Sequence, residues 1–178
     1  MDSFYSEKEL QTIGFKSIGD NVKLSRKASV YSPQFISIGN NVRIDDFCIL
    51  SGNITIGSHV HISAYVALYG AKGILLEDYC GISAKSIVYS AMDDFSGDYL
   101  IGPIHHREKT NVTGGLVRIR KYSQVGAGVI VFPNLEIGEG TVIGALSLVL
   151  HSVDDWGVYC GIPCKRLKDR NQGLLKYV

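Results

Sequence analysis

An aliphatic residue recurs at every sixth position over most of this 178-residue chain, and that spacing limits the possible folds more than any other feature. The fourth residue after each aliphatic is usually small or β-branched, as at Val22, Cys48, Ser86 and Thr141. An amphipathic helix would instead space its apolar residues by three and four. The aliphatic positions are Ile18, Leu24, Val30, Ile36, Ile38, Ile44, Leu50, Ile56, Ile62, Leu68, Ile74, Leu76, Ile82, Val88, Ile119, Val125, Val131, Ile137, Ile143 and Val149.

A six-residue unit with one large and one small inward side chain describes a short strand followed by a tight corner. Three such units make one triangular turn of a coil, and the pattern slips by two residues about once per coil. Stacked coils pair as parallel strands about 4.8 Å apart, so about seven coils give a prism roughly 30–35 Å long. We expect the glycines that follow many aliphatic residues, and the pair Asn40–Asn41, to supply positive φ at corners.

This pattern, which covers about 15–163, resembles that of the hexapeptide-repeat acyltransferases. The resemblance implies an all-β chain folded as a left-handed parallel β-helix of about seven coils. It also implies a homotrimer whose active sites lie between subunits. The handedness rests on the resemblance alone, because crossovers between parallel strands are generally right-handed.

We expect one domain over 1–178, with short extensions at both ends of the coils. The segment 1–14 is expected to cap the stack with a short helix, since Ser6 can act as its N-cap and Gly14 as its stop. Such a cap protects unpaired strand edges from aggregation. The tail 164–178 is basic and mildly apolar, and we expect a turn or short helix that leaves the prism.

The charge and composition exclude several classes of function. A total of 18 basic residues against 17 acidic ones gives a net charge of +1, so no surface for nucleic acid or an anionic membrane is expected. No apolar run approaches the roughly 18 residues of a transmembrane helix, and the polar start of the chain does not resemble a signal peptide. The hydrophobic content of 46% suffices for a core.

The cysteines have a structural interpretation. They form no Cys-x-x-Cys pair, which weakens zinc-finger and thioredoxin-like interpretations. Cys48 and Cys80 fall on the small inward position, and Cys160 does so if the last coil starts at Trp156. We therefore expect three buried thiols and no disulfide, in keeping with a cytoplasmic location.

A long insertion at about 91–116 interrupts the repeat. Chemistry has to be displayed somewhere on a rigid scaffold, and long insertions commonly carry it, so we expect this segment to be functional. A solvated and variable surface excursion is the structural alternative.

The stretch Gly102–His106 resembles the His-Pro-Val-His-His motif of galactoside and maltose acetyltransferases, whose first histidine is the general base. Gly102 stands at that position here. An amine needs less help from a base than a sugar hydroxyl does, so this departure favours N-acylation. The alternative is O-acetylation of a sugar or polysaccharide, with His105 or His106 as the base.

Three segments resemble nucleotide-sugar N-acyltransferases that modify dTDP-linked amino-dideoxy sugars: Ser3–Ser6, Ile36–Phe47 and Met92–Gly97. The resemblance implies an acyltransferase acting on a sugar or nucleotide-sugar amine, for surface glycans such as the O-antigen of lipopolysaccharide. It implies that carboxylates and hydroxyls surround the amine, which singles out three catalytic candidates. They are Asp93, Asp94 and Ser83, with turn formation and corner hydrogen bonding as the structural alternatives.

The same resemblance implies acetyl-CoA or another acyl-CoA as the acyl donor, lying along small residues of the coils. Gly126–Ala127 and Gly144–Ala145 occupy matching positions one coil apart, with Ser147 beside the second pair. A backbone N–H there can stabilise the oxyanion of the intermediate. Lys165 and Arg166 follow a Gly-x-Pro motif and are candidates for the CoA phosphates. Corner geometry and a solvated basic tail are the structural alternatives.

The histidines do not predict a metal site. His59 and His61 alternate and so share one strand face. The γ-class carbonic anhydrases, which share the coil fold, place two zinc-binding histidines five residues apart, and no such pair exists in this sequence. A non-catalytic β-helix scaffold or binding subunit is the remaining alternative from another functional class.

Overall fold

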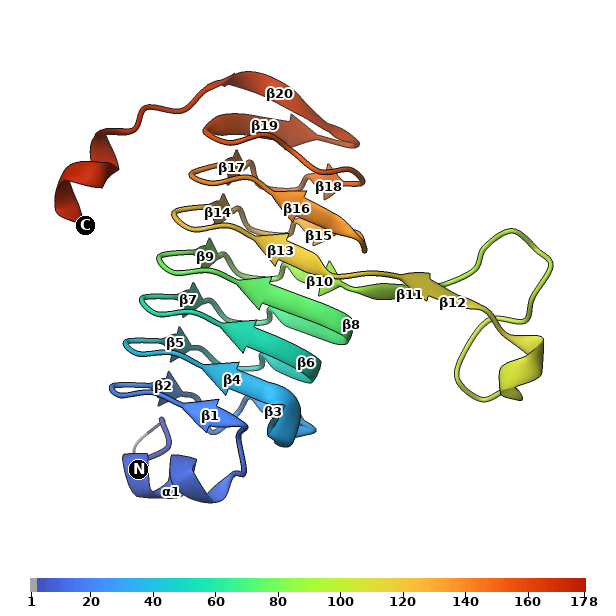
Figure 1. The fold of residues 1–178 in the computed structure, drawn as a ribbon, viewed down its shortest axis with the longest axis horizontal. Coiled ribbons are helices and arrows are strands. Elements are labelled where there is room, and N and C mark those ends of the chain that lie inside the picture. The colour runs from blue at the N-terminus through green and yellow to red at the C-terminus, as the bar shows by residue number, and fades with distance from the viewer. Residues whose placement is uncertain (1–2) are drawn as a thin grey trace.

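The computed structural model describes residues 3–178 and forms a parallel β-solenoid with seven successive coils (Figure 1). The predicted all-β coil architecture is therefore confirmed. Met1 and Asp2, which the sequence assigns to the N-terminal cap, lie outside the described residues. No helix within 3–178 is long and apolar enough to cross a membrane.

Each of the first six coils contributes one short strand to each of three faces of the prism, and the seventh contributes a strand to one face. Face A contains β1 (Ser17–Ile18), β4 (Ile36–Ile38), β13 (Val117–Ile119), β16 (Leu135–Ile137) and the second halves of β6 (Ile49–Ile56) and β8 (Ala67–Leu76). Face B contains β2 (Lys23–Leu24), β5 (Arg43–Ile44), β7 (His61–Ile62), β9 (Gly81–Ile82), β14 (Gln124–Val125), β17 (Val142–Ile143) and β19 (Gly157–Gly161). Face C contains β3 (Ser29–Tyr31), the first halves of β6 and β8, β10 (Ile87–Tyr89), β15 (Ile130–Val131) and β18 (Leu148–Val149). The corners between these faces are called AB, BC and CA.

The six-residue period produces the core directly. Each large aliphatic residue points inward and stacks on its equivalent one coil away, as in the parallel register Ile44, Ile62 and Ile82. These side chains are essentially inaccessible to solvent, and their burial stabilises the fold by about 25 cal/mol for each Å² of apolar surface removed from water. The small inward position is also buried. Where a hydroxyl occupies it, as in Ser86 and Ser123, the Oγ donates to a backbone carbonyl.

The expectation that the glycines after the aliphatic residues supply positive φ is wrong for Gly19, Gly39 and Gly57. At these positions the next coil approaches too closely for a side chain. A Cβ on Gly39 would lie 2.7 Å from the carbonyl carbon of Gly57. Positive φ falls two residues later, at positions such as Asn41, which confirms one member of the Asn40–Asn41 pair.

The residues with positive φ at corner AB stack along the prism. The side chains of Asn21 and Asn41 are hydrogen-bonded at 2.8 Å, and the rings of His59 and Tyr79 stack with centroids 4.6 Å apart. Left-handed backbone costs non-glycine residues about 1–3 kcal/mol each, so contacts with the neighbouring coils have to offset this strain. The stack continues from Tyr79 through Tyr122 to Trp156.

The N-terminal helix α1 (Glu7–Thr12) confirms the predicted cap. The Ser6 side chain accepts from the backbone N–H of Glu9, the Glu9 carboxylate accepts from the Ser6 N–H, and Leu10 is buried against the core. Gly14 has φ +90°, as its predicted role as the stop requires.

The expected C-terminal turn or short helix after Pro163 is wrong for the first part of the tail. β20 (Cys164–Asp169) pairs antiparallel with β19 and covers the edge of the last coil, and a short 3₁₀ helix, η3 (Gly173–Tyr177), follows. The expected burial of Cys160 is also wrong. Tyr159 fills the inward position of this coil, so Cys160 points outward and is exposed. Cys48 and Cys80 are buried as predicted, and burial raises their thiol pKa values to about 11 and about 12.

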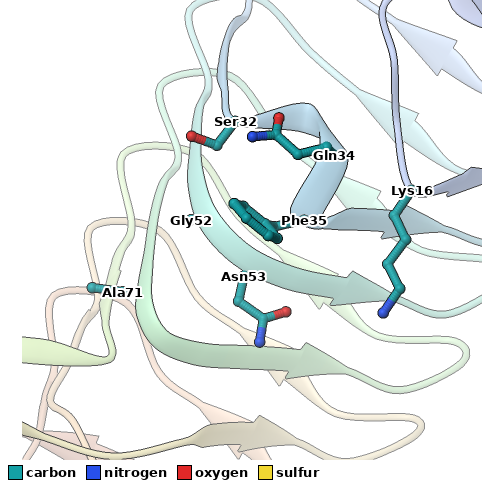
Figure 2. Close-up of a pocket in the computed structure, with 7 residues that line it drawn as sticks. All are labelled: Lys16, Ser32, Gln34, Phe35, Gly52, Asn53 and Ala71. Atoms are coloured by element: carbon teal, nitrogen blue, oxygen red, sulfur yellow. The ribbon is translucent and has the colours of Figure 1, made fainter.

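The insertion leaves the prism at corner CA, between β10 and β13, at the predicted bounds. Its base is ordered into an antiparallel hairpin of β11 (Ala91–Asp93) and β12 (Val112–Gly114), and a 3₁₀ turn, η2 (Arg107–Lys109), lies further out. Figure 1 shows the rest of the insertion projecting away from the coils. The same corner carries the 3₁₀ turn η1 (Pro33–Phe35) and a pocket beside it (Figure 2).

We predict that Gly39→Ala destabilises the protein by about 1–3 kcal/mol, the usual range for overpacking a tight interior, because its Cβ would displace the backbone of the next coil. Thermal denaturation measures the effect. Gly173→Ala is the matched control, since only the flexible Asn171 side chain lies near that position. Equal melting temperatures for the two variants would contradict the steric role of the coil glycines.

Candidate active site

The base of the insertion forms a pocket at corner CA. It is lined by the hairpin residues Met92–Phe95, Thr113 and Gly114, and by Phe132–Asn134 from the following coil. The pocket therefore lies between the ordered hairpin at the base of the insertion and the coil that follows it. Two of the catalytic candidates, Asp93 and Asp94, line it side by side.

The structure separates the roles of these two aspartates. Asp94 Oδ1 accepts from the backbone N–H of Ser96 at 2.7 Å, and its Oδ2 accepts from Asn111 Nδ2 at 2.8 Å. The Ser96 backbone N–H, the Ser96 side chain and Asn111 together lower the pKa of Asp94, so this carboxylate holds the hairpin closed and is a weak base. Within residues 3–178 the Asp93 carboxylate has no hydrogen-bond or ion-pair partner, which leaves it available to a ligand in the pocket.

Ser83 lies at corner BC, at the opposite edge of face C from the insertion. Its backbone N–H donates to the carbonyl of Val125 in the next coil, and its half-buried side chain is hydrogen-bonded to Gln124. Gln124 Nε2 donates to Ser83 Oγ at 3.0 Å and to the Val125 carbonyl at 3.1 Å. Because a carbonyl can only accept, the second bond fixes which end of the Gln124 amide faces Ser83.

This contact directs the Ser83 hydroxyl. An oxygen that accepts from Gln124 is free to donate its own proton away from the coil, toward a ligand at corner BC. Gly81, one coil before Gln124, makes room for the amide, since a Cβ there would collide with Gln124 Oε1. The sequence analysis did not identify Gln124 as a candidate. The signal that could have identified it is a polar side chain on the outward face of a strand, paired in register with a glycine, Gly81, that leaves room for it.

The proposed acyl-CoA track runs along the same corner as Ser83. The N–H groups of Gly126 and Gly144 donate to the carbonyls of the next coil, so they are not free to bind an oxyanion. The neighbouring N–H groups of Ala127 and Ala145 make no hydrogen bond within the described part of the chain. The useful donors of this track are therefore the alanine amides, with the glycines providing close approach.

Ser147 does not line this track. It is buried, its Oγ donates to the Gly144 carbonyl at 2.7 Å, and the same oxygen accepts from the Gly161 N–H at 3.0 Å. Both hydrogen-bonding directions are thus used inside the corner, and Ser147 joins two successive coils.

The two basic candidates lie on β20 and differ in their partners. Arg166 donates to Tyr159 Oη at 2.9 Å and to Asp169 Oδ1 at 2.7 Å. Lys165 is exposed and, among residues 3–178, its ammonium has no polar partner. Lys165 is therefore the more available cation for a phosphate.

The histidines are dispersed. His105 and His106 are exposed on the outer part of the insertion, His61 pairs with Asp45 at 2.8 Å, and His59 belongs to the aromatic stack. Among the residues that the structure describes, no group of three or more histidine, cysteine or acidic side chains is placed to hold a metal ion.

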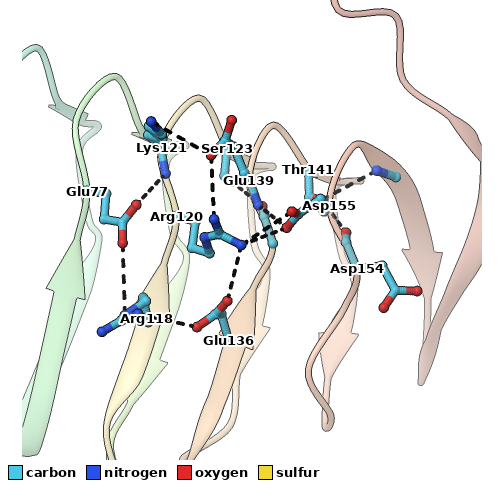
Figure 3. A network of polar contacts seen from close by, with 12 residues as sticks. Glu77, Arg118, Arg120, Lys121, Ser123, Glu136, Glu139, Thr141, Asp154 and Asp155 are labelled. Carbon is cyan, nitrogen blue, oxygen red and sulfur yellow. Dashed lines mark hydrogen bonds and ion pairs between the residues drawn. The ribbon is translucent and has the colours of Figure 1, made fainter.

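A charged network on face A links the coils before and after the insertion (Figure 3). Arg118 lies between Glu77 and Glu136, and Arg120 contacts Glu136 and Asp155. The acidic and basic side chains of this network pair with one another, so we interpret it as a structural connection between coils and not as a catalytic site. Exposed ion pairs of this kind contribute about 0–1 kcal/mol each.

Known proteins match both the coils and the whole chain. Residues 35–70 match the family model described as bacterial transferase hexapeptide (six repeats). The dTDP-4-amino-4,6-dideoxy-D-glucose acyltransferase of Escherichia coli is 42% identical over 177 residues, which cover 98% of this chain and 92% of that protein.

Solved structures of AntD, an N-acyltransferase from Bacillus cereus, match with a TM-score of 0.97. AntD in complex with dTDP and 3-hydroxybutyryl-CoA is 53% identical, and the match covers 99% of this chain and 95% of AntD. A variant with one serine replaced, solved with dTDP-4-amino-4,6-dideoxyglucose and coenzyme A, is 52% identical with the same coverage. Other AntD variants have one aspartate replaced.

The likenesses to the Escherichia coli acyltransferase and to AntD extend over nearly the whole chain and show that it belongs to the hexapeptide-repeat acyltransferases. Within that family it is an N-acyltransferase close to AntD.

We predict that Gln124→Ala lowers the turnover of acyl transfer about tenfold, because it leaves the Ser83 hydroxyl free to rotate, while the KM for acyl-CoA stays near normal. If the Ser83 hydroxyl donates to the developing oxyanion, its loss costs about 100- to 1000-fold in turnover, so Ser83→Ala is expected to be at least as damaging as Gln124→Ala. If Gln124 acts through Ser83, the double variant is no worse than Ser83→Ala alone. Additive losses would contradict this positioning role.

Proposed function

We propose that this protein transfers an acyl group from acyl-CoA to the amino group of dTDP-4-amino-4,6-dideoxyglucose. The observation that carries the proposal is the near-complete match to AntD and to the Escherichia coli acyltransferase, whose names and bound ligands specify this donor and this acceptor. The free Asp93 carboxylate and the directed Ser83 hydroxyl supply the chemistry that such a transfer needs.

The reaction is a direct attack of the neutral amine on the thioester carbonyl. The nitrogen–carbon bond forms, the carbon–sulfur bond breaks, and the nitrogen loses a proton while the departing thiolate gains one. Asp93 is suited to hold the ammonium form of the substrate and to accept its proton. The Ser83 hydroxyl and the free N–H groups of Ala127 and Ala145 are suited to stabilise the oxyanion.

No covalent enzyme intermediate is needed. Burial holds the Cys48 and Cys80 thiol pKa values at about 11 and about 12, which keeps both groups protonated and unreactive. Lys165, exposed at the end of the acyl-CoA track, is the group that we assign to the CoA phosphates.

The product would remain an activated sugar. A sugar linked to a nucleoside diphosphate is consumed by glycosyl transfer, which fits the assembly of surface glycans, including the O-antigen of lipopolysaccharide. Four free cysteines suit a reducing compartment such as the cytoplasm.

We also propose that the enzyme works as a homotrimer, because face C has an apolar outer surface. Its outward residues pair in register along the prism, and two tyrosines beside them, Tyr69 and Tyr89, stack at 5.4 Å. Contiguous apolar patches of this kind mark association surfaces. The outward column is Ile49, Ala67, Ile87, Ile130 and Leu148. The equivalent positions on face B include Lys23, Arg43, His61 and Gln124.

A trimer with face C turned toward the symmetry axis would bring corner BC of one copy beside corner CA of the next. Ser83 and the acyl-CoA track would then meet the Asp93 of a neighbouring copy. The insertion supports this arrangement, since several of its large apolar side chains are at least 44% exposed within their own chain. They are Phe95, Tyr99, Leu100, Ile101 and Ile104, all exposed.

The function is tested by incubating the purified protein with dTDP-4-amino-4,6-dideoxyglucose and either acetyl-CoA or 3-hydroxybutyryl-CoA, following release of the CoA thiol. We expect transfer to the amine, and a loss of about 100-fold or more in turnover for Asp93→Asn, since a positioned base typically contributes about 100- to 10,000-fold. The variant with both His105→Ala and His106→Ala is expected to keep near-normal turnover.

Two outcomes would contradict the proposal. If no amide product formed from either donor, the assigned reaction would be wrong. If the double histidine variant lost about three orders of magnitude while Asp93→Asn remained active, a histidine base and O-acylation would be favoured instead.

The assembly is tested by Ile130→Asp, which places a charge in the apolar column of face C. We expect a trimeric mass for the wild-type protein by light scattering and a shift toward monomer in the variant. The activity of the variant should fall in proportion to its fraction of monomer. Val142→Asp on face B is the matched control and should stay trimeric. A monomeric wild-type protein with full activity would refute the shared site.

A further inference from the structure

We propose that Asn111 is a positioning residue for acyl transfer, because its side chain and that of Asp94 form a clamp that holds the neighbouring Asp93 carboxylate in place. The clamp consists of Asp94 and Asn111, which face each other at the outer end of the hairpin of β11 and β12. This inference rests on the proposed function, in which Asp93 accepts the proton of the substrate amine.

The clamp extends the hairpin by one pair beyond its last regular residues. The register of the two strands ends with Asp93 opposite Val112. One step further out, the Asp94 N–H donates to the Asn111 carbonyl at 2.9 Å, and Asn111 Nδ2 donates to Asp94 Oδ2 at 2.8 Å. Terminal residues of a secondary-structure element fray most easily. The clamp therefore places Asp93 inside the hydrogen-bonded hairpin and not at its fraying end.

The clamp is also the point at which the outer part of the insertion, residues 95–110, is attached. Asp94 Oδ1 accepts from the backbone N–H of Ser96 at 2.7 Å. Within residues 3–178 this is the one hydrogen bond between 95–110 and the rest of the chain, and no ion pair joins them. A single carboxylate thus holds both ends of the outer part, through Ser96 at its start and Asn111 just after its end.

The position of the outer part determines the surroundings of Asp93. Asp93 lines the pocket at the base of the insertion, and it also lines a smaller pocket between the hairpin and Gly102–Pro103 of the outer part. If the clamp opens, the outer part can turn about its two ends, and the Asp93 backbone is held on one side only. A displacement of about 1 Å at a reacting group can cost about 100-fold in rate, so this freedom would slow the reaction.

The clamp requires one charged and one neutral partner. The ionised Asp94 carboxylate can only accept hydrogen bonds, and the Asn111 amide supplies a donor. Hydrogen bonds from Ser96 and Asn111 lower the pKa of Asp94, so the carboxylate stays ionised and the bond stays charge-assisted. Among the residues that line this pocket, Asp93 is the other titratable group, and an ionised carboxylate cannot replace the donor.

The first test replaces the donor. We expect Asn111→Ala to lower the turnover about tenfold or more, although not below that of Asp93→Asn, and to leave the KM for acyl-CoA unchanged. Amide hydrogen exchange measured by mass spectrometry should become faster in 91–94 and 111–114, while the melting temperature stays the same because the clamp lies outside the prism. Asn171→Ala is the matched control. It removes an asparagine that makes one hydrogen bond on the C-terminal tail, and it should change none of these quantities.

The second test exchanges the two partners. Asn111→Asp alone sets two carboxylates against each other, and like charges this close cannot both ionise without cost. Its turnover relative to wild type should fall at neutral pH and recover as the pH falls toward the carboxyl range, where one of the two groups holds a proton and donates it. Combined with Asp94→Asn, the new amide can accept from the Ser96 N–H and donate to the new carboxylate. This double variant should regain near-normal turnover at neutral pH.

The outcomes separate the positioning role from the function on which it rests. If the wild-type protein acylates the dTDP-linked sugar and Asn111→Ala keeps full turnover, the positioning role is wrong and the function stands. Failure of the double variant to exceed Asn111→Asp at neutral pH would also overturn the role, because the hydrogen bond would then not be its basis. Absence of an amide product with the wild-type protein would overturn the proposed function, and the positioning role with it.

Discussion

The close approach of one coil to the next is the constraint on which the rest of this structure depends. Parallel hydrogen bonds hold neighbouring coils at a fixed spacing, so any residue whose Cβ points along the prism axis has to be glycine, as at Gly39 and Gly57. A repeat of one coil follows, because each strand and corner must lie in register with its equivalent in the coil below, and three equal sides divide that coil into units of six residues. The same stacking builds straight columns along each face and corner, and these columns are where function can be placed.

The period predicted most of the scaffold. It placed Ile44 and Cys48 inside the prism and gave the bounds of the insertion. The short polar segment before the first coil was predicted to be a helical cap, because Ser6 and Gly14 are residues that begin and end helices. The errors came where the period weakens. Tyr159 shows that the inward position of the last coil accepts a large ring, which moved Cys160 to the surface, and β20 pairs with an edge that local sequence does not reveal.

The candidate site was less predictable, because the decisive facts are about hydrogen bonds already used. Asp93 and Asp94 are identical as sequence, yet one carboxylate is committed to Ser96 and Asn111 and the other is free. Gly126 and Ala127 are adjacent, yet only the alanine N–H is available. The residue type indicates which side chains and amides could bind a ligand. Whether each of them is free to do so depends on the hydrogen bonds that the folded chain has already formed.

The two halves of the candidate site lie at opposite edges of face C, and this separation has a consequence for how the enzyme can work. A rigid prism cannot bend to bring Ser83 to Asp93, since the strands between them are hydrogen-bonded on both sides. A second copy can bridge the distance without any motion of the coils, provided that face C is the surface it meets. The apolar column on that face then has a catalytic purpose as well as a structural one. In the proposed trimer, selection for activity would act on Ile87 and Ile130 as strongly as on the residues that contact substrate, because the two halves of the site would meet only where these surfaces associate.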